Sequence, residues 1–520
     1  MADVTPSSPS FDSSTTQHRN LVLTVAKGAG IAMIARISSK VFLLGSQAFL
    51  ARTLGQADYG LWALGWSVFQ VGTMAAALGL PMGVIRFGAP TLRVNRARFR
   101  QVVQQILALV VLSGIFWGLA LFLGSSWIAG FYHKPALAPV LRWIAIPLGI
   151  AAVLRVVAST VQITRVGLSI VLRDLLPAIF LGLGAWVLTF LFSWGIQGAL
   201  WSLALAQGLA LGVALVALFV LYRDVYRPAA WTWTFFREVL GYALPVCFSG
   251  LLFLVLEWTP RLVLGYFRPV NEVGIYQAAA QTATLPGIIL FSISSIFSPV
   301  IARLAGQEGT REQINELYKI TTKWSFYLSI PPMLALLLFP KTALGLLFGS
   351  SYMEGSTVLL ILALAQLFHA ATGTVTTMHA MLGRQKALVI QVSIGALTTF
   401  LLNVALVPSL GVVGAALGGA LGLTTANLLG IIYLRRALRL WPYDKRYGKG
   451  LLAGGGTLLV MALFQWTPLP RLWQAGLASV VGVVVFLALL WWLHFDEEDQ
   501  IFFDAVWRRV RRGGKAKTQA

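Results

Sequence analysis

Long hydrophobic stretches, separated by short polar segments, recur along the chain from near residue 25 to residue 494. Most of them reach the roughly 20 apolar residues that a helix needs to cross a bilayer. A membrane-spanning barrel would instead show short segments of alternating polarity, and the sequence has no such pattern. We therefore predict an all-α integral membrane protein with about 14 transmembrane helices, near residues 25–50, 58–82, 100–124, 137–159, 166–191, 196–221, 239–266, 274–301, 325–349, 356–381, 387–407, 411–434, 450–466 and 472–493.

The composition agrees with this class. The chain is 58% hydrophobic and only 11% charged, with a mean hydropathy of +0.78. Soluble domains carry about 25% charged residues. The 50 glycines suit the close approach of helices in lipid.

The net charge of +22 raises the question of a nucleic-acid partner. Its distribution argues against one, because arginine and lysine gather in alternate connecting segments, chiefly residues 86–100, 435–449 and 508–517. Connecting segments rich in these residues stay in the cytoplasm. We therefore expect a multi-pass protein with both termini in the cytoplasm, and no nucleic-acid partner.

The two halves of the chain contain similar short motifs. The sequence DYGLW at residues 58–62 is matched by EVGIY at 272–276, 214 residues later. GIQGA at 195–199 is matched by GVVGA at 411–415, 216 residues later. Six predicted spans separate the copies, and an even number gives both copies the same orientation. A parallel repeat with a substrate site between its halves is one architecture of secondary transporters.

This repeat predicts two parallel six-helix lobes plus two extra C-terminal helices. The domains we expect are a disordered cytoplasmic tail (1–24), an N-lobe with spans 1–6 (25–222), a cytoplasmic linker (223–238), a C-lobe with spans 7–12 (239–438), spans 13–14 (439–494) and an amphipathic, basic cytoplasmic tail (495–520).

Charged residues inside the spans are the candidate chemistry, because a charge at bilayer depth is costly unless it faces a bundle interior or a water-filled cavity. In the first span Arg36, Lys40 and Gln47 share one helical face. We interpret them as the cationic wall of a cavity for an anionic substrate. The alternative is that both cations reach the membrane surface or pair with carboxylates on other helices.

The seventh span carries Glu257 and Arg261, with Pro260 between them. An ion pair within the helix explains both charges without a substrate. The proline break, however, is typical of helices that bend during transport, so a role of this pair in substrate binding or gating explains the sequence equally well.

Asp174, in the fifth span, is adjacent to Arg173 and so should point elsewhere, which makes it a candidate partner of Arg36 or Lys40. Asp174, Glu257 and His369 are candidates for the coupling of transport to an ion. Arg142 and Arg155 lie nearer the span ends and can reach the membrane surface. No motif for a cofactor, a metal or a nucleophile stands out, so we expect none.

Three runs resemble a known family. They are FLARTLG at 49–55 before DYGLW, RLVLGYF at 261–267 before EVGIY, and LLFGSSY at 346–352. In order and spacing they resemble bacterial lipid-linked oligosaccharide flippases, the polysaccharide-transport branch of the multidrug/oligosaccharidyl-lipid/polysaccharide exporter superfamily. That family commonly has an acidic residue before the arginine of span 7, where this chain has Pro260.

The resemblance implies alternating access without covalent chemistry, and therefore no enzyme. It implies a glycan linked to undecaprenyl diphosphate as the substrate, membrane lipids and polysaccharide polymerases or glycosyltransferases as partners, and the bacterial plasma membrane as the location. Two alternatives remain. A cation-coupled multidrug exporter would be expected to carry carboxylates in the N-lobe cavity, and a glycan-transferring enzyme would usually need a larger outer loop than this chain has.

Overall fold

A computed structural model describes residues 12–229, 231–494, 496 and 498–499, with side chains from residue 33 onward. All regular structure in these residues is helical, as predicted. The predicted C-terminal tail lies almost entirely outside them. Helix α1 begins at Asp12, within the segment predicted as a disordered tail. The helix thus extends beyond the predicted hydrophobic span toward the N-terminus.

The first half of the chain forms seven α-helices and three short irregular ones. They are α1 (Asp12–Ala77), α2 (Leu80–Val94), α3 (Arg96–Phe131), α4 (Leu137–Gln162), α5 (Val166–Ile170), the π-helix η1 (Val171–Leu175), α6 (Leu176–Ala185), the π-helix η2 (Trp186–Leu191), α7 (Gly195–Leu221) and the 3₁₀ helix η3 (Arg223–Tyr226).

The second half forms the remaining helices. They are α8 (Trp233–Phe267), α9 (Val270–Ala283), α10 (Gly287–Ala305), α11 (Arg311–Leu338), α12 (Pro340–Phe348), η4 (Ser350–Gly355), α13 (Ser356–Thr372), α14 (Val375–Met381), α15 (Gln385–Leu438), α16 (Lys445–Leu463), η5 (Phe464–Trp466) and α17 (Arg471–Trp492).

Eleven helices of the described residues are long and apolar enough to cross a membrane, or twelve if α11 and α12, bent by 88°, form one broken span. Two of the eleven are themselves divided. Helix α1 changes direction at Gly55 (φ 74°) and α15 at Gly411 (φ 54°), where the backbone leaves the helical region. Gly55 lies between two predicted spans and Gly411 is the first residue of the span predicted at 411–434, so each connection is made at a single glycine of positive φ that leaves the helix formally unbroken.

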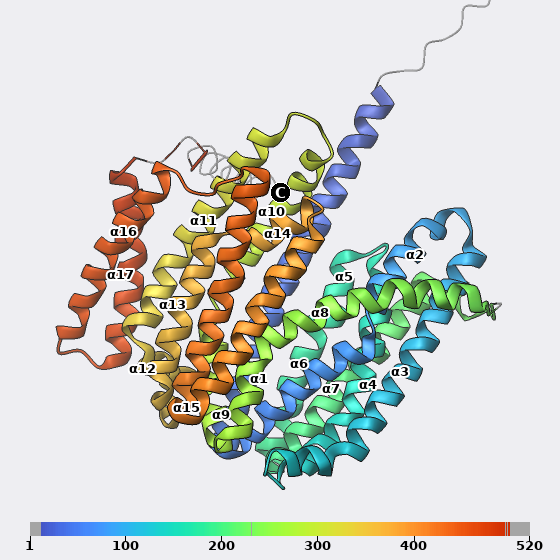
Figure 1. Ribbon diagram of the computed structural model, residues 1–520, viewed down its shortest axis with the longest axis horizontal. Helices are drawn as coiled ribbons and strands as arrows, with labels where there is room; N and C mark the ends of the chain where they lie inside the picture. Colours follow the sequence, from blue (N-terminus) through green and yellow to red (C-terminus); the bar gives the residue numbers. More distant parts are fainter. Residues whose placement is uncertain (1–11, 230, 495, 497, 500–520) are drawn as a thin grey trace, which may run out of the picture.

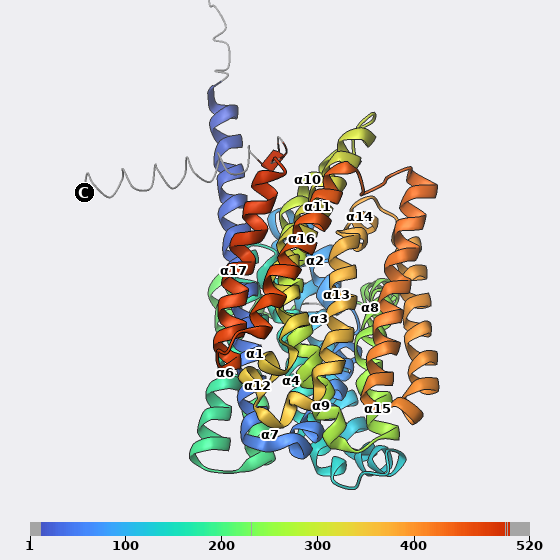
Figure 2. The ribbon, with the colours of Figure 1, turned by 90° about the vertical axis from the view of Figure 1, so that its left-hand side faces the viewer.

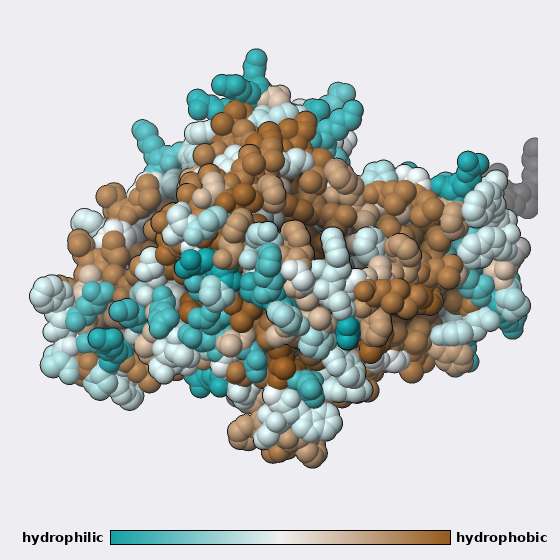
Figure 3. Space-filling model, turned by 60° about the horizontal axis from the view of Figure 1, so that its bottom comes forward, coloured by the Kyte–Doolittle hydropathy of each residue, from teal (hydrophilic) through white to brown (hydrophobic). Residues whose placement is uncertain are grey.

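The helices form two bundles that meet at one end and separate toward the other (Figure 1). One bundle contains α2 to α7, the other α9 to α15, and α1 and α8 run between them. Helices α16 and α17 pack against α11 on the outside of the second bundle (Figure 2). Apolar side chains cover much of the flanks, while polar ones gather near the end where the bundles meet (Figure 3).

The two copies of the DYG/EVG repeat contact one another at that end. A Cβ atom on Gly60 would lie 2.6 Å from the carbonyl carbon of Val270, and one on Gly274 would lie 2.5 Å from the carbonyl oxygen of Gln56. Gln56 and Val270 are themselves 214 residues apart, so the two contacts are reciprocal. Reciprocal contacts of equivalent residues are the mark of a two-fold relation, as expected for a parallel repeat.

Candidate functional site

A cavity of about 1160 Å³ lies between the two bundles. It is slightly larger than the 300–1,000 Å³ of common small-molecule sites. We call the polar lining residues from the first bundle and α1 the N-wall, and those from α8 onward the C-wall. The N-wall contains Arg36, Ser39, Lys40, Gln70, Arg155, Arg173, Asp174 and Gln207. The C-wall contains Glu257, Gln281, Thr284, Ser292, Ser294, Ser295, Ser298, Gln366, His369, Thr374, Thr376 and Thr377.

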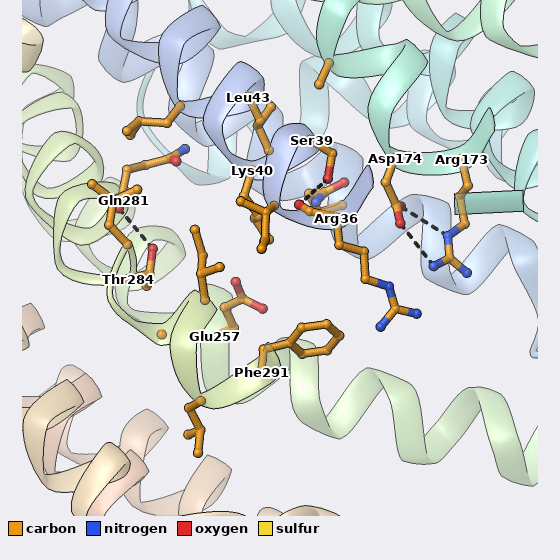
Figure 4. A pocket seen from close by; sticks show the side chains of 18 of the residues that line it. Arg36, Ser39, Lys40, Leu43, Arg173, Asp174, Glu257, Gln281, Thr284 and Phe291 are labelled. Atoms are coloured by element: carbon orange, nitrogen blue, oxygen red, sulfur yellow. Dashed lines mark hydrogen bonds and ion pairs between the residues drawn. The ribbon is translucent and has the colours of Figure 1, made fainter. Parts of the chain in front are cut away.

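The structure brings Arg36 and Lys40 into this cavity, as the sequence predicted (Figure 4). They extend from the same face of α1, and the guanidinium of Arg36 lies 4.8 Å from the ring centre of Phe291 on α10. Arg155 on α4 and Arg173 in η1 add two further cations. All four cations of the cavity belong to the N-wall.

Asp174 does not pair with α1, contrary to the prediction. Its carboxylate accepts two hydrogen bonds from Arg173, from Nε and Nη2, each 3.1 Å long. The two residues are adjacent in a π-helix, and the long arginine side chain bends back far enough to reach its neighbour. Figure 4 shows the pair beside Arg36.

The charge of the cavity is therefore unbalanced toward positive. Four cations face two carboxylates, Asp174 and Glu257, and Asp174 is already paired. Arg36, Lys40 and Arg155 form no ion pair with another described residue. Charges at bilayer depth are tolerated where they face a cavity, and the excess positive charge of this lining would attract an anion.

Arg261 lies outside the cavity and is buried, with 7% of its surface exposed. Its Nη1 donates to the carbonyl oxygen of Glu257 over 2.8 Å, and its Nε donates to Gln277 on α9. The ion pair between Arg261 and Glu257 that we considered is thus not formed, since it is the backbone of Glu257 that Arg261 contacts. The carboxylate of Glu257 points into the cavity (Figure 4).

Gln47 is also outside the cavity and fully buried. Its Oε1 accepts hydrogen bonds from Trp62 Nε1 (2.9 Å) and Tyr59 Oη (3.3 Å), across the bend at Gly55. The helical face of Arg36 and Lys40 extends to Gln47 as predicted, but the cavity ends before it because the second half of α1 packs there.

His369 lies on the C-wall, and its Nδ1 is 3.1 Å from Asn427 Oδ1 on α15. Two features were missed by the sequence reasoning. Arg155 was interpreted as a residue that reaches the membrane surface, and the serines and threonines of the C-wall were not singled out. Their helices are apolar on nearly all sides, so periodicity does not reveal which side faces the cavity.

At the end where the bundles meet, residues 51–56 of α1 contact residues 346–352 of α12 and η4. Arg52 donates to the carbonyl oxygens of Leu346 and Leu347. Tyr352 Oη donates to the carbonyl oxygen of Ala51 over 3.0 Å, and Gln56 Nε2 to that of Ser351 over 2.6 Å. We call these contacts the seal. They connect α1 with α12 and η4 at this end of the molecule.

Known proteins are similar to this chain in sequence. The family described as polysaccharide biosynthesis protein matches residues 49–357. A protein of Haloferax volcanii named as the probable low-salt glycan biosynthesis flippase Agl15 is 26% identical over 34% of this chain and 38% of its own length. The probable flippase AglR of the same organism is 25% identical over 44% of this chain and 49% of its own length. The matches thus cover less than half of each relative.

Similarity of structure extends over more of the chain. A solved structure of the lipid II flippase MurJ in an inward closed conformation superposes with a TM-score of 0.72. The match covers 91% of this chain and 98% of that one, at 15% sequence identity. At this level of identity the likeness establishes a shared fold.

Proposed function

The chain belongs to the polysaccharide biosynthesis protein family, and on that premise we propose that it is a flippase that moves a polyprenyl-diphosphate-linked oligosaccharide from the cytoplasmic to the outer leaflet. The product would serve the assembly of cell-surface polysaccharide. The family match confirms the resemblance inferred from the sequence motifs. The relatives named as flippases support a transport protein rather than an enzyme.

The cationic N-wall is the observation that carries the proposal. A diphosphate leaving water loses its hydration, and Arg36, Lys40 and Arg155 offer charged donors that replace part of it. Hydrogen bonds to a charged group contribute about 1.5–3 kcal/mol each. A cavity for a cationic drug would have the opposite sign, which disfavours the multidrug alternative.

The position of the seal supports the direction. The cavity and the N-terminal part of α1 lie on one side of it, and the segments rich in arginine and lysine, such as residues 86–100, lie at the end away from it (Figure 1). The positive-inside rule assigns that end to the cytoplasm. We propose that α1 and α15 each cross the membrane twice, which with the broken span gives the predicted fourteen crossings.

Alternating access then proceeds by relative movement of the N-lobe (25–222) and the C-lobe (239–438). The seal opens as the cytoplasmic side closes around the headgroup, while the prenyl tail stays in lipid. Gln47 and Arg261 lie beside the seal rather than in the cavity, so we propose that they contribute to gating. Asp174, Glu257 and His369 line the cavity and remain the candidates for ion coupling.

Transport in proteoliposomes tests the proposal. A fluorescent oligosaccharide on undecaprenyl diphosphate would be followed by its protection from a membrane-impermeant quencher. We expect wild type to move it and Arg36→Ala/Lys40→Ala to lose most of the rate. Arg142→Ala is the matched control, because Arg142 bonds Ser125 and Ser126 away from the cavity. Equal rates in a folded double variant would refute the site, and movement of cationic drugs alone would favour the exporter.

A further inference from the structure

The two walls of the cavity differ in chemistry as well as in position. The N-wall has four cations and a single hydroxyl, Ser39, whose proton is donated to the carbonyl oxygen of Arg36. The C-wall has eight serine and threonine hydroxyls and no cation among its described lining residues. Binding of a diphosphate alone does not account for the polar hydroxyls of the C-wall.

Several polar groups of the C-wall are available to a ligand. Serine and threonine in membrane helices commonly bond the carbonyl of the preceding turn, and Ser292 and Ser298 do so, with the carbonyls of Ile288 and Ser294. The described structure gives no such bond to the hydroxyls of Ser294, Thr376 and Thr377 or to the side-chain amides of Gln281 and Gln366. These five groups come from α9, α10, α13 and α14 and line one cavity.

The charge of the C-wall limits what can bind there. Its one acidic side chain among the described lining residues is Glu257, which has no ion-pair partner among the described residues. A ligand with its own carboxylates would be repelled by Glu257 and would find no cation on this wall. Hydroxyl and acetamido groups, by contrast, both donate to and accept from serine, threonine and glutamine.

We propose that the C-wall is a sugar subsite that binds the uncharged sugars nearest the diphosphate while the N-wall holds the phosphates. The proposal rests on the flippase function. It assigns the glycan specificity to Gln366, Thr377 and the hydroxyls around them, and it assigns the substrate class to neutral hydroxylated or N-acetylated sugars at the lipid-linked end. Glu257 excludes acidic sugars from the same position.

Binding to protein in nanodiscs, measured by native mass spectrometry, tests the division. The probes are undecaprenyl diphosphate, the same lipid with one N-acetylhexosamine, and the same lipid with one hexuronic acid. We expect wild type to bind the N-acetylhexosamine lipid about tenfold more tightly than the sugar-free lipid. Gln366→Leu/Thr377→Val should bring this ratio near one without changing the affinity for the sugar-free lipid. Gln207→Leu, the matched substitution on the N-wall, should leave the ratio unchanged.

Glu257→Gln should raise the affinity for the hexuronic acid lipid toward that for the neutral one. The N-wall variant Lys40→Gln should weaken all three lipids by the same factor. If the sugar-free lipid binds wild type in a Lys40-dependent way but the sugar changes nothing, the sugar subsite is refuted and the flippase proposal stands. If the sugar-free lipid does not bind, the flippase proposal itself fails.

Discussion

Substitution of Gly60 by alanine is expected to open the sealed end. In the structure a Cβ on Gly60 would lie 2.6 Å from the carbonyl carbon of Val270, closer still to its oxygen, and 3.3 Å from the nitrogen of Gly274. All three atoms belong to the backbone of α9, so rotation of a side chain does not relieve the contact. Because ordinary contacts between carbon atoms are about 3.5 Å or more, the helices must separate by about 1 Å.

The expected magnitude follows from this overlap. Overpacking of this kind costs about 1–3 kcal/mol. The cost applies only while the seal is closed, so the population should shift toward the outward-open state by about 5- to 150-fold. The transport rate should fall, because the inward-facing state becomes rare.

Spin labels at Ala136 and Glu354, exposed positions near the sealed end of the two bundles, would report the shift as a longer distance by pulsed electron resonance. Gly124→Ala is the control, because a Cβ there meets nothing within 4 Å. An unchanged distance distribution in folded Gly60→Ala would refute the close packing of Gly60 against α9 at the sealed end.

Two further predictions concern residues outside the cavity. Gln47→Leu removes the acceptor of Trp62 and Tyr59, so it should lower the free energy of unfolding by about 1–3 kcal/mol, measured by chemical denaturation in detergent. The affinity for undecaprenyl diphosphate should stay unchanged. A loss of affinity at unaltered stability would instead make Gln47 a substrate contact. Lys323→Met leaves the three carboxylates that bond this 3% exposed lysine without their central cation, so it should cost about 3 kcal/mol and lower Tm, with no effect on lipid binding. An unchanged Tm would contradict the role of this cluster in attaching the segment after α17 to α11.

Much of the fold could be predicted from the sequence because lipid imposes simple rules. Hydrophobic length located the helices, and the repeat at Gly60 and Gly274 indicated two similarly oriented halves. The bend at Gly55 falls between two predicted spans, and the bend at Gly411 falls on the first residue of one. The sequence could not show that a single glycine would connect two spans without ending the helix. The pattern of hydrophobic residues does not depend on the backbone angles of one glycine.

The site was predicted in part. Two cations four residues apart on one helix had to share a face, so Arg36 and Lys40 could be placed together. Arg155 could not, because its helix is apolar on nearly every side and its rotation is set by packing. Asp174 was assigned to the wrong partner for a different reason. The flexible side chain of Arg173 bends back to pair with Asp174, and helical spacing alone does not predict such a contact.

The transport rate of Lys40 variants tests the central claim most directly, since the claim is that positive charge in the N-wall holds the diphosphate. Lys40→Arg and Lys40→Gln would be compared with wild type in proteoliposomes, using the oligosaccharide on undecaprenyl diphosphate. Lys40 has no partner in the described structure, so neither change should disturb the fold. We predict that Lys40→Arg keeps most of the rate and Lys40→Gln loses about tenfold or more. Equal rates for the two variants would contradict a diphosphate site at this cavity.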